Sequence, residues 1–186
     1  MTPGSVAGYG LEMIRNVDVL VLGAGAAGMM AAIEAGRRGR SVLVVDHARA
    51  PGEKIRISGG GRRNFTNLNT RPEHFLSANP HFAKSALARY TPRDFVTLVE
   101  RHRIPYHEKA AGQLFCDRAA ADIVQMLLAE CADAGARVLT GCAVRSLAGC
   151  FDADTSAGAF HSPSLVVATG GLSIPKIVAT PFGYEI

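Results

Sequence analysis

An apolar segment near the start of the chain runs directly into a glycine-rich turn, and this junction restricts the possible folds more than any other feature. Residues 18–22 read Asp-Val-Leu-Val-Leu, and the turn Gly23-Ala-Gly25-Ala-Ala-Gly28 follows. In the pattern G-x-G-x-x-G, the first glycine allows a tight turn, the second leaves room for a pyrophosphate, and the third lets a helix pack closely on the sheet. The helix directs its N-terminal N–H groups toward that anion. The turn predicts a dinucleotide cofactor, with an ordinary strand-to-helix turn as the alternative.

The residues after this turn complete a βαβ unit. Residues 29–38 are predicted to form a helix, and residues 41–45 form a second apolar strand that ends at Asp46. Asp46 lies 18 residues beyond Gly28, where dinucleotide-binding folds place an acid that binds the adenosine ribose. An acid there favours a free 2′-hydroxyl over a 2′-phosphate. The alternative is that Asp46 is only a solvated carboxylate at the end of a strand.

Composition places the chain among ordinary α/β proteins that are soluble in the cytoplasm. Its 186 residues are 48% hydrophobic and 19% charged, and no apolar run approaches the roughly 18 residues of a membrane span. Residues 1–16 carry no secretory signal and are predicted to be a flexible tail, which leaves 17–186 as the nucleotide-binding domain. No C-x-x-C pairing links the cysteines, so we expect buried free thiols in a reducing compartment. They are Cys116, Cys131, Cys142 and Cys150.

A second glycine-rich stretch, residues 52–67, is predicted to be a loop near the first turn. Three consecutive glycines at 59–61 bring backbone N–H groups within reach of one ligand, and polar side chains surround them. We interpret the loop as part of a cofactor site, with a flexible solvated loop as the alternative. Nucleic acid is not an expected partner, because Phe65 is the only aromatic residue in the stretch and base stacking would require more.

The rest of the chain alternates helices with short strands. The predicted elements are a helix at 92–102 capped by Thr91, strands at 104–107 and 113–116, and a helix at 119–134. Strands at 138–140, 143–147, 150–153 and 159–161 are predicted to form an antiparallel meander, and a buried strand follows at 165–168. The last strand ends in Thr169-Gly170-Gly171, which can lie beside the first turn because ligands bind at the carboxyl ends of parallel strands. The predicted fold class is therefore α/β and Rossmann-like, with a parallel sheet built on the βαβ unit and an antiparallel β-meander.

Candidate catalytic and metal-binding residues are absent from the sequence patterns. No zinc-binding, nucleophile-elbow or P-loop motif occurs, so any chemistry is expected to come from a cofactor and no metal is predicted. His102 and His107 are the strongest acid–base candidates, but no partner is visible for either. We interpret them as surface or satisfied core histidines.

Three motifs together resemble one family. They are Gly23 to Gly28, Ser58-Gly-Gly-Gly-Arg62 with Asn64 and Thr66-Asn67, and Ala168-Thr-Gly-Gly-Leu-Ser-Ile-Pro175. The family is that of the BaiN-like (aminoacetone oxidase-like) FAD-dependent oxidoreductases, and the similarity runs from about residue 17 to residue 184. It implies FAD as the bound cofactor and two-electron transfer at the flavin, with NAD(P)H as a possible external electron donor. The cofactor-binding residues that it implies are Gly23, Gly25, Ala26, Ala27, Gly28, Asp46, Lys54, Ser58, Gly60, Gly61, Arg62, Asn64, Thr66, Val144, Thr169, Gly170 and Gly171.

The chain departs from the family pattern at several positions and in length. The family usually has Cys at the position of Arg63, Pro at Cys116, and Gly at Val178 and Pro181. Its members are considerably longer, with an inserted substrate domain and a final FAD-binding segment. We therefore expect an N-terminal portion of such a protein, with unknown catalytic residues, substrate and oligomeric state. A non-catalytic nucleotide-binding remnant and the NAD-binding half of a dehydrogenase are the alternatives.

Overall fold

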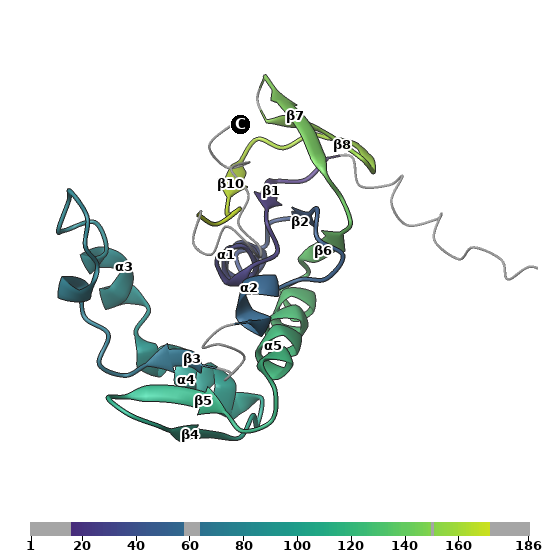
Figure 1. Ribbon diagram of the computed structural model, residues 1–186. Coiled ribbons are helices and arrows are strands. Elements are labelled where there is room, and N and C mark those ends of the chain that lie inside the picture. Colours follow the sequence, from purple (N-terminus) through teal and green to yellow (C-terminus); the bar gives the residue numbers. More distant parts are fainter. Residues whose placement is uncertain (1–15, 58–63, 150, 172–186) are drawn as a thin grey trace, which may run out of the picture. The chain divides into compact units, whose positions relative to one another are not determined.

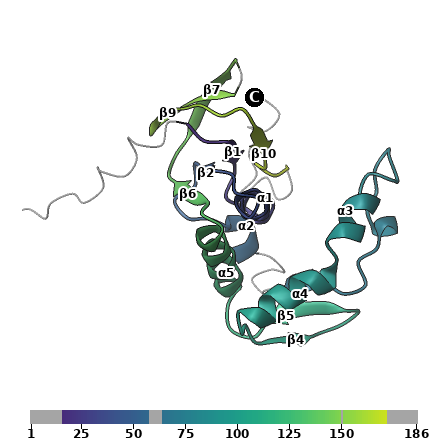
Figure 2. The same cartoon turned by 180° about the vertical axis from the view of Figure 1, so that it is seen from behind.

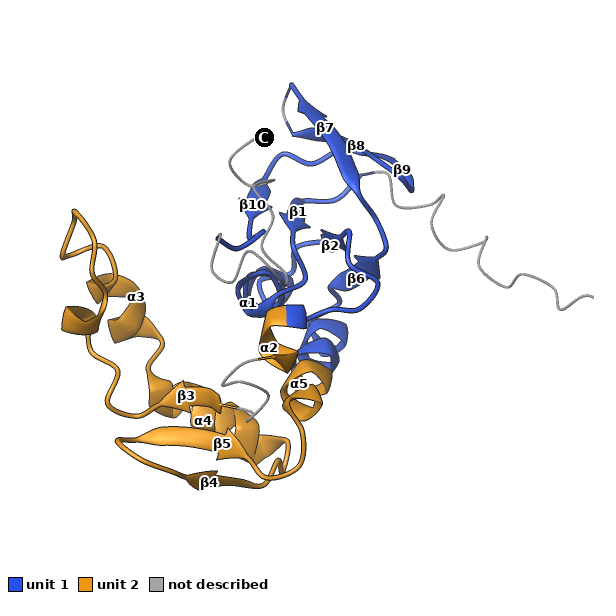
Figure 3. Cartoon of the chain, in the orientation of Figure 1, with its two compact units in different colours: residues 1–53, 127–186 blue, residues 54–126 orange. Residues whose placement is uncertain are grey.

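The computed structural model describes residues 16–57, 64–149 and 151–171 (Figure 1). Nearly all of the expected tail at 1–16 lies outside these residues, as do Cys150, Arg63, Val178 and Pro181. The chain forms two compact units, one built from residues 1–53 and 127–186 and the other from residues 54–126 (Figure 3).

The first unit contains a four-stranded parallel sheet. Its order is β10 (Leu165–Val167), β1 (Val19–Leu22), β2 (Val42–Asp46) and β6 (Arg137–Thr140). The strands β1 and β2 are apolar along almost their whole length because both faces of a parallel sheet are covered. Helix α1 (Ala26–Gly36) connects them, which confirms the predicted βαβ unit. The helix begins three residues earlier than expected, because the glycine turn leads into it without an intervening loop.

Alternate residues of β1 and β2 pack against different layers. Leu20, Leu22, Leu43 and Val45 share one core cluster with Phe160 of the β-meander. The meander consists of β7 (Val144–Ala148), β8 (Asp152–Thr155) and β9 (Gly158–Phe160), all antiparallel. Toward the other face, buried Met29, Ala32 and Ile33 of α1 pack over the intervening strand residues. The predicted combination of parallel sheet and meander is confirmed.

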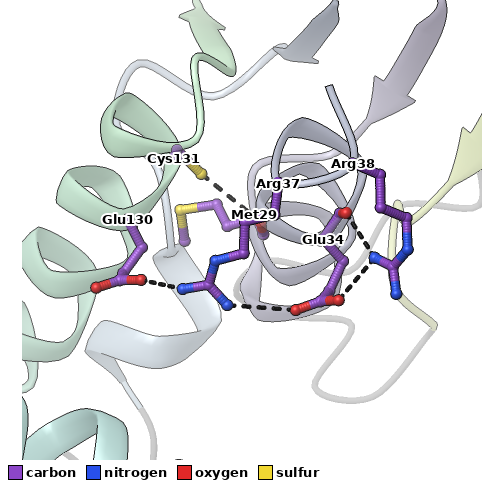
Figure 4. A network of polar contacts seen from close by, with 6 residues as sticks. All are labelled: Met29, Glu34, Arg37, Arg38, Glu130 and Cys131. Atoms are coloured by element: carbon purple, nitrogen blue, oxygen red, sulfur yellow. Dashed lines mark hydrogen bonds and ion pairs between the residues drawn. The ribbon is translucent and has the colours of Figure 1, made fainter. Parts of the chain in front are cut away.

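Helix α5 (Ala120–Asp133) packs its last residues against α1 within the first unit, as Figure 4 shows. The Cys131 thiol donates a hydrogen bond to the Met29 carbonyl at 3.6 Å, and Arg37, the C-cap residue of α1, forms an ion pair with buried Glu130. A Cβ added at Gly36 would overlap the Ala134 carbonyl, so glycine permits this close approach. Ile123, Leu127 and Cys131 are all buried, which confirms their predicted common face.

The second unit is built on a three-stranded antiparallel sheet ordered β3 (Asn64–Asn67), β5 (Gln113–Cys116), β4 (Tyr106–Glu108). The described part of this unit also contains α2 (Glu53–Arg56), the 3₁₀ turn η2 (Pro72–His74), α3 (Lys84–Arg89), α4 (Pro92–Arg101) and residues 120–126 of α5. Thr91 caps α4 by accepting a hydrogen bond from the Asp94 N–H, as predicted. The β4–β5 hairpin is also confirmed.

Two predicted assignments are wrong. Residues 52–67 are not a loop throughout, because α2 occupies one end and β3 the other. The strand β3 forms because β5 supplies hydrogen-bond partners from far along the chain. Residues 138–140 belong to β6, which pairs with β2 in the parallel sheet and not with the meander. In both cases the pairing partner is non-local, so the local pattern cannot specify it.

Candidate functional site

The glycine turn after β1 has the geometry of an anion-binding loop. Gly23 has φ +106°, and a Cβ there would lie 2.5 Å from the Ala168 carbonyl oxygen, so only glycine fits between β1 and the end of β10. A Cβ at Gly28 would overlap the Gly23 carbonyl and press against Val21, which explains the close packing of α1. By contrast, a Cβ at Gly25 would meet no atom of the described residues within 4 Å. The middle glycine therefore faces open space.

The first turn of α1 presents its backbone to that space. Gly25 is the N-cap residue, no side chain in the described part of the chain caps the helix, and the first turn contains no acidic residue. Ala26 and Ala27, which follow, are exposed. The N–H groups and the positive end of the helix dipole are thus uncompensated by the described side chains, an arrangement suited to a phosphate group.

Asp46, at the end of β2, holds this loop in place. Its Oδ2 accepts a hydrogen bond from the Ala24 N–H at 2.7 Å, and its Oδ1 accepts one from the Ala48 N–H at 2.9 Å. The side chain is 15% exposed. The residue chosen as a ribose ligand therefore also has a structural contact, which its position in the sequence did not reveal. Because a carboxylate offers about four acceptor positions, both oxygens retain capacity for a ligand hydroxyl.

A pocket of about 280 Å³ opens beside Asp46 in the first unit. It brings together four residues predicted from the sequence, Gly23, Asp46, Val144 and Thr169. The other lining residues are Leu22, Val45, His47, Cys142 and Ala143. The sequence reasoning missed His47, although its position directly after Asp46, at the carboxyl end of a parallel strand, could have marked it.

The end of β10 lies beside the glycine turn, as expected. The Ala168 N–H donates to the Leu22 carbonyl at 2.8 Å, which extends the β1–β10 pairing to the turn itself. Gly170 has φ +78°, and both Gly170 and Gly171 are exposed. The structure thus gathers Thr169 and the neighbouring glycines at the same sheet edge as Gly23.

The remaining predicted ligands lie outside the first unit or outside the described residues. Lys54, Asn64 and Thr66 belong to the second unit, on α2 and β3. The other members of the predicted second loop lie outside the described residues, namely Ser58, Gly60, Gly61 and Arg62. Their contribution to a cofactor site stays a prediction.

His102 and His107, the acid–base candidates from the sequence, both make interactions in the structure. His107 Nδ1 lies 2.6 Å from Asp117 Oδ1, and the His107 side chain is 57% exposed. His102 also makes an interaction. Across the described ranges, no group of three or more His, Cys, Asp or Glu side chains is arranged to hold a metal ion. Nor is any described helix both long and apolar enough to span a membrane.

Comparisons with known proteins match this chain to longer ones. Residues 17–186 match the family described as HI0933-like protein Rossmann domain. Two relatives are named ribosomal RNA dihydrouridine synthase. The one from Escherichia coli is 49% identical, with 93% of this chain and 44% of the relative covered, and the one from Haemophilus influenzae is 48% identical, with 94% and 45% covered. The chain therefore spans less than half the length of these relatives.

A more distant relative and a solved structure complete the comparison. The 3-dehydro-bile acid delta(4,6)-reductase of Clostridium scindens is 25% identical, with 89% of this chain and 42% of the relative covered. This chain is thus more similar in sequence to the two ribosomal RNA dihydrouridine synthases than to the bile acid reductase. The 3-ketosteroid-delta4-(5alpha)-dehydrogenase of Rhodococcus jostii superposes with a TM-score of 0.62 at 18% identity, covering 84% of this chain and 46% of that one. That likeness supports the Rossmann-like fold class.

Proposed function

Because the chain belongs to the HI0933-like Rossmann domain family, we propose that it holds FAD and forms the cofactor-binding part of a flavin-dependent oxidoreductase. The observation that carries this proposal is the open space at Gly25, next to the uncapped start of α1 and the pocket beside Asp46. A dinucleotide needs an anion site and an adenosine site side by side at the carboxyl edge of a parallel sheet. Both occur there.

The residues of the first unit fit the adenosine diphosphate half of FAD. We assign the pyrophosphate to the backbone of Gly25, Ala26 and Ala27, where a side chain is absent or short. We assign the adenosine to the pocket, where Asp46 would accept from ribose hydroxyls and Val144 would contact the adenine. Lys54 and the 58–66 segment are proposed for the flavin half on the family resemblance. Bound FAD would supply two-electron transfer.

We further propose that the substrate is uridine in ribosomal RNA. Support comes from the names of the two relatives at 49% and 48% identity. Conversion of uridine to dihydrouridine adds a hydride and a proton across the C5–C6 double bond, so it needs a two-electron donor, for which we propose NAD(P)H. Among the described residues, Cys116, Cys131 and Cys142 are buried and not joined in disulfides, which supports our proposal of a cytoplasmic location.

This proposal departs from the expectation that nucleic acid is not a partner. That expectation rested on the single aromatic residue in 52–67. The Phe65 ring lies 6.1 Å from that of Phe95 and 5.6 Å from that of Tyr106, measured between centroids. Phe65 is half-buried and packs on two rings of its own unit, so we assign the RNA contact to other residues.

The cofactor part of the proposal is tested by purifying the chain, incubating it with FAD, removing unbound flavin and recording the visible absorption spectrum. We expect retained flavin bands and no displacement by excess NAD. A folded chain that stays colourless would overturn the FAD assignment, and displacement by NAD would favour the NAD-binding alternative.

The substrate part is tested separately in an Escherichia coli strain that lacks its ribosomal RNA dihydrouridine synthase. The chain is expressed there, and dihydrouridine in ribosomal RNA is measured by mass spectrometry. Restored dihydrouridine would support the proposed reaction. Bound FAD without restored dihydrouridine would favour the non-catalytic remnant for the chain as it stands.

A further inference from the structure

Positive charge is concentrated in the second unit of the chain. Residues 54–126 contain twelve Lys and Arg and six Asp and Glu, a net charge of +6. The remaining residues contain eight Lys and Arg and ten Asp and Glu, a net charge of −2. Such asymmetry between parts of one chain is typical of proteins that bind a polyanion through one part.

Large apolar side chains are also exposed in one stretch of this unit. Of six exposed large hydrophobic residues among those described, four lie between residues 75 and 90. They are Phe75, Leu76, Phe82 and Tyr90, at 39%, 94%, 56% and 40% exposure. Single exposed apolar residues are ordinary, but a local group of them, with three aromatic rings, indicates a contact surface.

Aromatic and basic side chains are interleaved along this stretch. The rings of Phe75 and Phe82 meet edge to face, with centroids 6.4 Å apart, and a depression of about 290 Å³ beside Phe75 is also lined by Lys84. Arg71, Lys84 and Arg89 are exposed, and Glu73 is the only acidic residue between 71 and 90. We call these residues the 71–90 surface. Figures 1 and 2 show α3, which carries Lys84 and Arg89, apart from the strands β4 and β5 of the same unit.

We propose that the 71–90 surface binds single-stranded RNA. Bases would stack on Phe75 and Phe82, and phosphates would contact Arg71, Lys84 and Arg89, which is the combination that single-stranded nucleic acid sites use. Self-association through the same surface is disfavoured, because it would bring together two units of net charge +6. The inference rests on the proposed function, since it concerns where the RNA substrate is held.

The aromatic part is tested by fluorescence anisotropy with a labelled single-stranded RNA of mixed sequence, roughly 16 nucleotides long, the upper end of known site sizes. The double variant Phe75→Ala/Phe82→Ala should bind at least tenfold more weakly than the unaltered chain, since each stacked base contributes about 1–3 kcal/mol. The matched control is Phe151→Ala, because Phe151 is 41% exposed in the first unit. We expect its RNA affinity to be unchanged.

The charged part is tested by the salt dependence of the same affinity. The association constant K falls as salt rises, so the slope of log K against log[salt] is negative. The double variant Lys84→Gln/Arg89→Gln should make this slope shallower by about one for each lost phosphate contact. Arg145→Gln, in the first unit, should leave the slope unchanged. Equal effects in surface and control variants, or no RNA binding at all, would overturn the proposal. The proposal would also be overturned if light scattering showed a dimer for the unaltered chain and a monomer for the aromatic variant, while both bound RNA equally well.

Flavin retention is recorded on every variant, which separates this inference from the cofactor proposal. Variants that keep bound flavin and a cooperative unfolding transition but lose RNA affinity support the surface. RNA binding that survives in the aromatic variant would place the RNA elsewhere and leave the proposed function standing. Dihydrouridine that is absent from the complemented strain, with RNA affinity intact, would instead count against the proposed reaction.

Discussion

The Asp46 carboxylate accepts a hydrogen bond from the Ala24 N–H at 2.7 Å, so the end of β2 holds the loop that follows β1. The same carboxylate lines the pocket proposed for adenosine. One side chain therefore links the shape of the phosphate loop to the nucleoside site, and its removal should affect both.

Replacing Asp46 with Ala should weaken FAD retention and destabilise the first unit together. Loss of two hydrogen bonds to a charged, largely buried acceptor should lower the free energy of unfolding by on the order of 2 kcal/mol. Denaturant titration and flavin absorbance measure the two effects. Asp154→Ala is the control, because the Asp154 side chain is 52% exposed and lies 3.8 Å from its ion-pair partner. Full flavin retention in Asp46→Ala would contradict the site.

Two glycines of one motif should respond differently to the same substitution. Gly25→Val should still fold, with a free energy of unfolding lower by about 1 kcal/mol because valine is a poor N-cap residue. It should not bind FAD, because the valine side chain enters the open space. Gly28→Val should either fail to fold or have a free energy of unfolding lower by several kcal/mol, because its Cβ would overlap a backbone carbonyl. Circular dichroism and flavin retention distinguish the two. Unchanged FAD affinity in Gly25→Val would refute the placement of the pyrophosphate.

The two arginines that follow α1 should differ in their contribution to stability. Arg37 pairs with buried Glu130 and also with half-exposed Glu34 at 3.3 Å, whereas Arg38 pairs with Glu34 at 2.7 Å (Figure 4). Arg37→Ala should cost about 1–2 kcal/mol because it weakens the compensation of a buried carboxylate. Arg38→Ala should cost less than about 0.5 kcal/mol, typical of an exposed i,i+4 pair. Equal unfolding midpoints for the two variants would contradict this difference.

The Cys131 thiol should be unreactive at neutral pH. Burial, with a smaller contribution from Glu130, raises the pKa of this thiol to about 11 from 9.0. Because the folded pKa is raised, the neutral thiol favours the folded state below pH 9, and that stability is lost as pH rises toward 11. Mass-spectrometric mapping after alkylation at pH 8 should find Cys131 unmodified in the native chain and modified in guanidinium. Rapid native labelling would show that α5 does not protect it.

Local patterns predicted those elements whose signals are contained within a few residues. Thr91 and Pro92 marked the start of α4, and the spacing of Ile123, Leu127 and Cys131 marked the buried face of α5. Capping and helical periodicity act between near neighbours, so the sequence displays them directly. The sequence did not reveal the strand β3, which reads Asn-Phe-Thr-Asn. Phe65 is its one large apolar residue, and a single apolar residue gives no alternating pattern.

The sequence by itself determined the G-x-G-x-x-G turn, the helix after it and the acid at the end of the next strand, because backbone preference and periodicity are local properties. Only the tertiary structure decided that Ala168 would close on Gly23, that Val144 would share a pocket with Asp46, and that β6 would join the parallel sheet. Those contacts join segments far apart in the chain. Strand pairing and core packing select them for the fold as a whole, and no short window of residues contains that information.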